Sequence, residues 1–216
     1  MHRILQKKLA FINSSLRVRR GFSLIETIIV VAIFATMISA VAKLRSTTDL
    51  MQNIVSQKMT SRQDIDQALQ IMSSDIRSAG PSALGAYPIE SASTSSFVFF
   101  SDIDRDGIFE RERYFLTTST IMKGIEKPIG SPPAYSTSSE VLSLVTDKVI
   151  ISTTTPIFTY YDASYTGTQT SSLPLPIDVA KIRAVKISIY RDANPGMAPG
   201  PSLFTTTVTI RNLRSY

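Results

Sequence analysis

A run of alternating carboxylates suggests metal chemistry: the segment DIDRDG contains Asp102, Asp104 and Asp106. Carboxylates on alternate positions before a glycine form the first half of an EF-hand loop, whose oxygen ligands suit Ca²⁺. The second half does not match, because the twelfth position is Arg113 where a bidentate glutamate belongs, and Glu110 and Glu112 are off register. Two interpretations stay open, a Ca²⁺ site and a hairpin turn with solvated carboxylates, and the sequence favours the turn. We expect no other cofactor.

A carboxylate inside an apolar run is the second chemically unusual feature. The segment RVRRGFSLIETIIVVAIFA, residues 17–35, has three arginines before Gly21 and Phe22, and Glu26 follows within the apolar stretch. A charge at the edge of a membrane-length segment costs free energy unless something compensates it. We therefore expect Glu26 to have a partner, either within its own chain or on another molecule.

The composition argues against most enzyme chemistry. The chain has no cysteine, so disulfides, thiol nucleophiles and thiolate metal sites are excluded. Its one histidine is His2, which removes His-dependent triads and HExxH zinc sites from the rest of the chain. No GxSxG, SxxK or P-loop motif occurs, and only the carboxylates around Asp104 remain as candidates for hydrolysis. We expect that the protein is not an enzyme.

The positive charge of the chain is concentrated at its N-terminus. The formal net charge is +6, but the first 21 residues have no acidic side chain and contain Arg3, Lys7, Lys8, Arg17, Arg19 and Arg20. Without those six, the 23 Lys and Arg fall to 17, which equals the 17 Asp and Glu. Beyond residue 21 there is no basic stripe with interleaved aromatics, so nucleic acid is not an expected partner.

One long helix is expected to carry the N-terminal chemistry. Residues 22–79 contain neither proline nor glycine, whereas all eleven prolines lie at Pro81 or later. Residues 22–44 would form a transmembrane half of about 34 Å, long enough for a bilayer core. The basic residues place the leader, residues 1–21, in the cytoplasm, so the remainder faces outward.

Residues 45–80 predict an exposed amphipathic half of the same helix, ending at Gly80 as a C-cap and Pro81 as a stop. Apolar residues recur there at helical spacing, at Leu44, Met51, Ile54, Ile65, Leu69, Met72 and Ile76. One stripe should pack on a domain while the other face meets solvent or a neighbour.

Residues 81–216 predict a β-rich globular head, so the fold class is α+β. Residues 96–116 give two strand-like runs around a tight turn signalled by Asp106-Gly107. Three later β-branched segments predict more strands: VLSLVTDKVIISTTTPIFTYYD, AKIRAVKISIYRD and SLFTTTVTIRNL.

The N-terminal segment resembles the leader-peptide motif of type IV prepilins, in a basic leader ending in Gly21, then Phe22, an apolar run and Glu26. This resemblance implies cleavage after Gly21 by a membrane-embedded prepilin peptidase and N-methylation of Phe22. It also implies that Glu26 attracts the new terminal amine of an adjoining subunit and sets the register of a filament. The implied location is the bacterial inner membrane, in contact with lipid and the assembly machinery, and then the filament.

A looser resemblance extends beyond that motif. LQIMSSDIRSAG, residues 69–80, is similar to the helix end of J-type pseudopilins of type II secretion and of PilW-like minor pilins. The implied fold is pilin-like, with the long helix packed on an antiparallel head. The implied function is that of a minor subunit of a type IV pilus or type II secretion pseudopilus. Paired C-terminal cysteines and a proline in the membrane helix, usual in major pilins, are absent.

Three other interpretations stay open. A secretory signal could be cut after Ala42, in AVA at residues 40–42, and a plain anchor would not be cut at all. An anchored or secreted adhesion module outside any filament is also compatible with Ser/Thr-rich loops. The mature N-terminus discriminates among them: Phe22 for the filament subunit, Lys43 for the secreted protein and Met1 for the anchor.

Overall fold

The computed structural model describes residues 21–152, 154–168, 171–192, 195–196 and 200–213. It divides the chain into two compact units, one ending at Met51 and the other running from Gln52 to the C-terminal region. The first helix contributes to both units, and every strand belongs to the second.

The long helix α1 runs without interruption over Leu24–Arg77. The absence of proline and glycine leaves no residue that would remove a backbone donor or add conformational freedom within it. Glu26 lies in its first turn and Arg77 in its last, where each charge is favourable for the helix dipole. The expected single helix is therefore confirmed.

The end of α1 differs from the C-cap expected at Gly80. The amide of Ser78 bonds to the carbonyls of Ser74 and Asp75, which tightens the last turn after Arg77. Gly80 has no positive φ, and its amide donates to the carbonyl of Phe100 in the sheet. Its small size is needed instead for packing, because an added Cβ would lie 2.4 Å from Cε1 of Phe109.

The first sheet is an antiparallel meander of five strands in chain order: β1 Ile89–Ala92, β2 Ser96–Ser101, β3 Glu110–Thr117, β4 Thr120–Glu126 and β5 Val141–Thr146. The predicted β2–β3 hairpin is confirmed, with Ser101 paired to Glu110. Its connection is longer than the expected tight turn, because residues 102–109 all lie between the strands. Arg105 and Gly107 both have positive φ in this loop.

The second sheet is also antiparallel and consists of β6 Phe158–Tyr161, β7 Ala184–Arg191 and β8 Ser202–Thr209. Short 3₁₀ helices occur at Thr137–Ser139, Val179–Lys181 and Arg211–Leu213. The two sheets are joined by hydrogen bonds outside their ladders: the Phe158 amide donates to the Thr94 carbonyl, and the Tyr160 hydroxyl donates to the Ser93 carbonyl at 2.8 Å.

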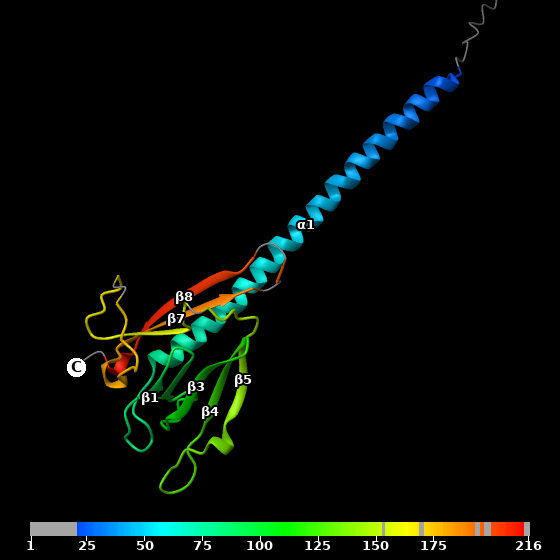
Figure 1. Ribbon diagram of the computed structural model, residues 1–216. Helices are drawn as coiled ribbons and strands as arrows, with labels where there is room; N and C mark the ends of the chain where they lie inside the picture. Colours follow the sequence, from blue (N-terminus) through cyan, green and yellow to red (C-terminus); the bar gives the residue numbers. More distant parts are fainter. Residues whose placement is uncertain (1–20, 153, 169–170, 193–194, 197–199, 214–216) are drawn as a thin grey trace, which may run out of the picture. The chain divides into compact units, whose positions relative to one another are not determined.

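One hydrophobic core joins the C-terminal part of α1 to both sheets, which lie on either side of it (Figure 1). The helix contributes a fully buried row at three- and four-residue spacing: Ile65, Leu69, Met72 and Ile76. Phe97, Phe99 and Tyr114 enter this core from the first sheet, and Phe158 and Ile187 enter it from the second. The α+β arrangement of a long apolar helix followed by antiparallel sheets is therefore confirmed, and it is consistent with a pilin-like fold.

The apolar stripe of α1 is buried over only part of its predicted length. Ile65 is the first fully buried residue of the stripe, whereas Leu44 and Met51 are 68% and 61% exposed. The stripe packs on the head, as expected, from Ile65 onward, which is six residues beyond Met59. The N-terminal part of the stripe keeps an apolar surface that the described residues do not cover.

The boundary at Ile65 gives a matched test of helix packing. Met72→Ala should lower the free energy of unfolding by about 2–5 kcal/mol, because it leaves a cavity in the core. Met59→Ala, on the same helix at a 63% exposed side chain, should change it by no more than about 0.5 kcal/mol. Urea unfolding of the full chain in detergent, followed by near-UV circular dichroism of the buried tyrosines, measures both. Equal losses for the two variants would contradict this boundary.

Candidate functional site

The N-terminal end of α1 presents the residues of the predicted processing motif. Gly21 and Phe22 precede the helix, and Phe22 is 77% exposed. Glu26 follows one turn later as an exposed side chain in the first helical turn. The arginines of the leader lie outside the described residues, so an intramolecular salt bridge to them stays a sequence-based alternative.

Hydroxyl side chains in the apolar part of α1 are satisfied by the helix itself, whereas the carboxylate of Glu26 is not. The hydroxyls of Thr27, Thr36 and Ser39 each donate to a carbonyl three or four residues earlier. Within the part of the chain that the structure describes, Glu26 has neither an ion pair nor a hydrogen bond. A hydroxyl so bonded tolerates an apolar environment, whereas an unpaired carboxylate there needs an external partner.

One helical segment is long and apolar enough to cross a membrane. It spans Leu24–Ser56 over 33 residues, with a mean hydropathy of 2.4 and with none of its apolar window buried. At about 1.5 Å per residue it would extend roughly 50 Å, beyond the roughly 30 Å of a bilayer hydrocarbon core.

The aspartate loop brings its three predicted ligands together. The carboxylates of Asp102, Asp104 and Asp106 offer oxygens that all lie within 4.8 Å of one another. The oxygens of Asp102 accept from the amides of Asp106 and Gly107, each at 3.1 Å. Three carboxylates this close repel one another, and these amides offset only part of that repulsion.

A fourth carboxylate and a lysine complete this acidic loop. Glu110 is only 1% exposed and accepts a 3.0 Å hydrogen bond from the Ile103 amide through Oε2. Its Oε1 has no hydrogen-bond partner and lies 3.5 Å from Nζ of Lys127. The same ammonium contacts Oδ2 of Asp104, and it lowers the pKa of that carboxyl. Lys127 therefore bridges the aspartate cluster and the buried glutamate.

Two glutamates of β3 face inward because of the register between strands. Glu112 pairs with Phe99 and Tyr114 pairs with Phe97, so all four side chains occupy the face that packs on α1. Arg111 therefore takes the opposite face, where it contacts carboxylates of β1 and β4. The alternation of charges in ERERY thus places acidic groups in the interior.

A buried charge cluster connects α1 to this face of the first sheet. Oδ2 of Asp75 accepts from the Tyr114 hydroxyl at 2.6 Å and from Nζ of Lys123 at 2.7 Å. The same ammonium lies 2.9 Å from Oε2 of Glu112, whose side chain is fully buried. Two carboxylates therefore share one ammonium. Burial first, and then the charge of Asp75, raise the pKa of Glu112 to about 7, although Lys123 opposes the shift.

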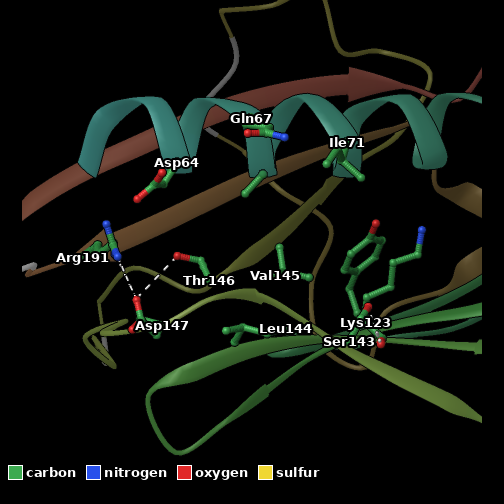
Figure 2. A pocket seen from close by; sticks show the side chains of 12 residues that line it. Asp64, Gln67, Ile71, Lys123, Ser143, Leu144, Val145, Thr146, Asp147 and Arg191 are labelled. Atoms are coloured by element: carbon green, nitrogen blue, oxygen red, sulfur yellow. Dashed lines mark hydrogen bonds and ion pairs between the residues drawn. The ribbon is translucent and has the colours of Figure 1, made fainter. Parts of the chain in front are cut away.

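A groove lies beside this cluster, between α1 and the edge strand β5 (Figure 2). Its cavity of about 560 Å³ is lined by Asp64 and Ile71 from the helix and by Leu144 from β5. The Arg191 guanidinium closes one end through a 2.8 Å ion pair with Asp147. The groove contains no nucleophile paired with a histidine base, since the only histidine of the chain is His2.

The sequence located part of these sites. It identified the three aspartates, which the fold brings together, but it set Glu110 aside as off register for the twelfth position of an EF-hand. Counting from Asp102, Glu110 is the ninth position, which also supplies a ligand in such loops, often through water. Asp75 was also missed as an interior residue, although it lies three residues after Met72 on the apolar side of the helix.

Comparison with known proteins adds one finding at the N-terminus. Residues 16–42 match the family described as the prokaryotic N-terminal methylation motif, and this range includes Gly21, Phe22 and Glu26. The motif supports a type IV prepilin-like protein, which implies a structural role, a membrane-anchored helix, processing by prepilin peptidase and association with other pilin subunits. No curated protein matches the chain.

The raised pKa of Glu112 predicts a pH-dependent stability. The folded state holds this proton more tightly than the unfolded chain, whose ordinary pKa is 4.5. The free energy of unfolding is therefore largest, as far as Glu112 is concerned, below about pH 4.5, and it falls as the pH rises toward about 7. Glu112→Gln cannot ionise and should remove this loss, becoming the more stable protein by roughly 2–3 kcal/mol at about pH 8.

This difference is measured by urea unfolding of both full-length proteins at a series of pH values. Glu90→Gln is the matched control, because its side chain is 42% exposed and lies outside the buried cluster. A Glu112→Gln protein whose stability runs parallel to that of the wild type from about pH 5 to 8 would refute the assignment.

Proposed function

We propose that this protein is a minor pilin or pseudopilin. Prepilin peptidase would cleave it between Gly21 and Phe22, methylate Phe22, and release a subunit that enters a type IV pilus or a type II secretion pseudopilus. The observation that carries the proposal is the exposed apolar surface of α1 with Glu26 as an unpaired carboxylate in its first turn. Before processing, the leader would lie in the cytoplasm and the head outside the inner membrane.

Cleavage would give Glu26 the partner that it lacks. A new ammonium on Phe22 lies at the end of the same apolar helix, one turn before the carboxylate. An ammonium and a carboxylate from adjoining subunits attract by about 4 kcal/mol at 4 Å when the effective dielectric constant is about 20. Each charge alone is unfavourable in an apolar surrounding, so the pair would select one axial offset between neighbouring helices.

The length of the exposed apolar surface also supports assembly. Beyond a bilayer-length segment, Leu50, Val55 and Met59 are still 53–64% exposed. A lipid bilayer would not cover all of a segment of about 50 Å. Packing against helices of other subunits would cover the bilayer-length segment and also the apolar residues beyond it. The heads would then form the outer surface of the filament.

The position within the filament is the finer part of the proposal. Similarity of residues 69–80 to J-type pseudopilins and PilW-like minor pilins favours a low-copy subunit near the tip. There it would help to initiate assembly or contact cargo. A membrane-anchored or secreted adhesion module is the alternative, and the mature N-terminus distinguishes it.

The first test is N-terminal analysis by mass spectrometry of the protein from membranes of the producing cells. The expected terminus is N-methylated Phe22. A terminus at Lys43 or Met1 would overturn the proposal in favour of a secreted protein or an uncleaved anchor, respectively.

The second test concerns Glu26 itself. Glu26→Gln should leave membrane insertion intact but reduce the protein in sheared filaments by at least about a hundredfold. The reason is that the terminal ammonium would be left uncompensated, at a cost of about 3–5 kcal/mol. Asp49→Asn is the matched control, since this exposed carboxylate lies on the same helix, beyond the predicted transmembrane half at residues 22–44. Immunoblots of filament and membrane fractions measure both, and unchanged incorporation of Glu26→Gln would contradict the proposed pairing.

A further inference from the structure

We propose that the outer edge of β5 binds an extended strand of a different polypeptide, in which apolar side chains alternate with a lysine or arginine that faces Asp64. The added strand would occupy the groove between α1 and β5 (Figure 2). This inference concerns the head alone and does not depend on assembly into a filament.

The strand β5 has an outer edge without a backbone partner. It is the last strand in the order of the first sheet, and among the described residues it pairs only with β4. Val141, Leu142 and Leu144 are 52–67% exposed on it. Its sequence, VLSLVT, contains neither a charged residue nor a proline, which commonly prevent an edge strand from pairing with another chain. An edge of this composition is stable when a further strand covers it.

Two other edge strands of the head are protected differently. β1 lies against the 3₁₀ helix Val179–Lys181, and the hydroxyl of Tyr87, just before β1, donates to the Ala180 carbonyl at 3.3 Å. β8 exposes Leu203 near its start and then the hydroxyl-bearing side chains of Thr205, Thr207 and Thr209. β5 differs from both, because its edge is open and its exposed side chains are apolar over several residues.

The groove beside β5 lies where an added strand would lie. Neighbouring strands of a sheet are about 4.8 Å apart, and their side chains point alternately to the two faces. On the face toward α1, an added strand would contact Ile71, a groove-lining residue that is 47% exposed. On the opposite face it would lie beside Leu142, which pairs with Gly124 in the ladder between β4 and β5. Strand addition of this kind takes its affinity from main-chain hydrogen bonds and its specificity from alternate side chains.

The charge of the groove selects a basic strand. Asp64 lines the groove from α1 and has neither an ion pair nor a hydrogen bond within the part of the chain that the structure describes. The two cations that line the groove are already bound to carboxylates, because Arg191 contacts Asp147 and Lys123 is shared by both carboxylates of the buried charge cluster. The groove therefore has an excess of negative charge. An ammonium or guanidinium on the added strand would compensate it.

The edges of a second copy of this chain do not supply such a strand. The edge strands β1, β5, β6 and β8 have the sequences IESA, VLSLVT, FTYY and SLFTTTVT, and none of them contains lysine or arginine. A strand with a basic residue therefore belongs to a different polypeptide. A helix in the groove would leave the outward backbone groups of β5 without partners, so an extended segment fits the edge better.

The experiment uses a fluorescently labelled synthetic peptide, Val-Thr-Lys-Val-Val-Thr, and follows its anisotropy as the full chain in detergent is added. Micelles without protein are the blank. Wild type should bind the peptide saturably with a Kd below about 1 mM. The same peptide with glutamate in place of lysine should bind about three- to tenfold more weakly, because like charges would face each other across the groove. A copy with every backbone nitrogen methylated should not bind, because it cannot donate hydrogen bonds to β5.

Two pairs of variants locate the site. Leu144→Lys should raise the Kd for the lysine peptide at least about tenfold, because a charge on an edge strand opposes strand addition. Leu203→Lys, at a comparably exposed leucine of β8, should leave it unchanged. Asp64→Asn should raise the Kd about two- to fivefold and reduce the preference for lysine over glutamate. Asp66→Asn, at an exposed aspartate of the same helix that does not line the groove, should have no effect.

Near-UV circular dichroism of the buried tyrosines shows that each variant is folded, and the comparison of peptides needs wild type alone. The absence of saturable binding of the lysine peptide to wild type up to about 5 mM would overturn the strand site. Binding that Leu144→Lys or complete N-methylation leaves unchanged would refute strand addition to β5. Equal affinities for the lysine and glutamate peptides would refute the charge selection. A protein that fails to enter filaments can still pass every one of these tests.

Discussion

The burial of one face of α1 between two antiparallel sheets is the constraint on which the rest of the head depends. Ile65, Leu69, Met72 and Ile76 form a single row that contacts aromatic and β-branched side chains from both sheets. Neither sheet has another large apolar element on which to pack within the described residues, so the helix supplies the centre of the core. The same helix continues toward its N-terminus with apolar side chains that the described residues do not cover, and an apolar surface of this kind is stable in contact with lipid or with other apolar helices.

The charged side chains also differ in how far partners within the chain compensate them. Between α1 and the first sheet, Asp75 and Glu112 share the ammonium of Lys123, and Asp75 also accepts from the Tyr114 hydroxyl, so part of their cost of burial is offset inside the chain. Glu26 has no such arrangement among the described residues, and its compensation is expected from another molecule. The acidic loop is a third case, because Lys127 contacts both Asp104 and Glu110 and offsets part of the charge of its carboxylates.

Some strands were readily predicted and others were not. β2, β3, β7 and β8 coincide with β-branched or aromatic runs that the sequence marks clearly, and the β2–β3 hairpin was expected. β4 was missed because its hairpin turn consists of Thr118 and Ser119 and contains no glycine, asparagine or aspartate, although Thr118 adopts a positive φ. The segment that was expected to continue from β5 forms no regular strand over residues 147–152 and 154–157, where Val149 makes only an isolated bridge to Arg191.

The sequence alone determined the long helix, the membrane-length apolar segment and the spacing of Gly21, Phe22 and Glu26, because these depend on local composition and on a periodicity within one element. The tertiary structure decided where the stripe of α1 enters the core, which residues of ERERY face inward, and that Lys127 contacts both Asp104 and Glu110. These features depend on strand register and on contacts between residues far apart in the chain, such as Asp75 with Lys123. A one-residue shift in register would turn the inward-facing side chains of a strand outward.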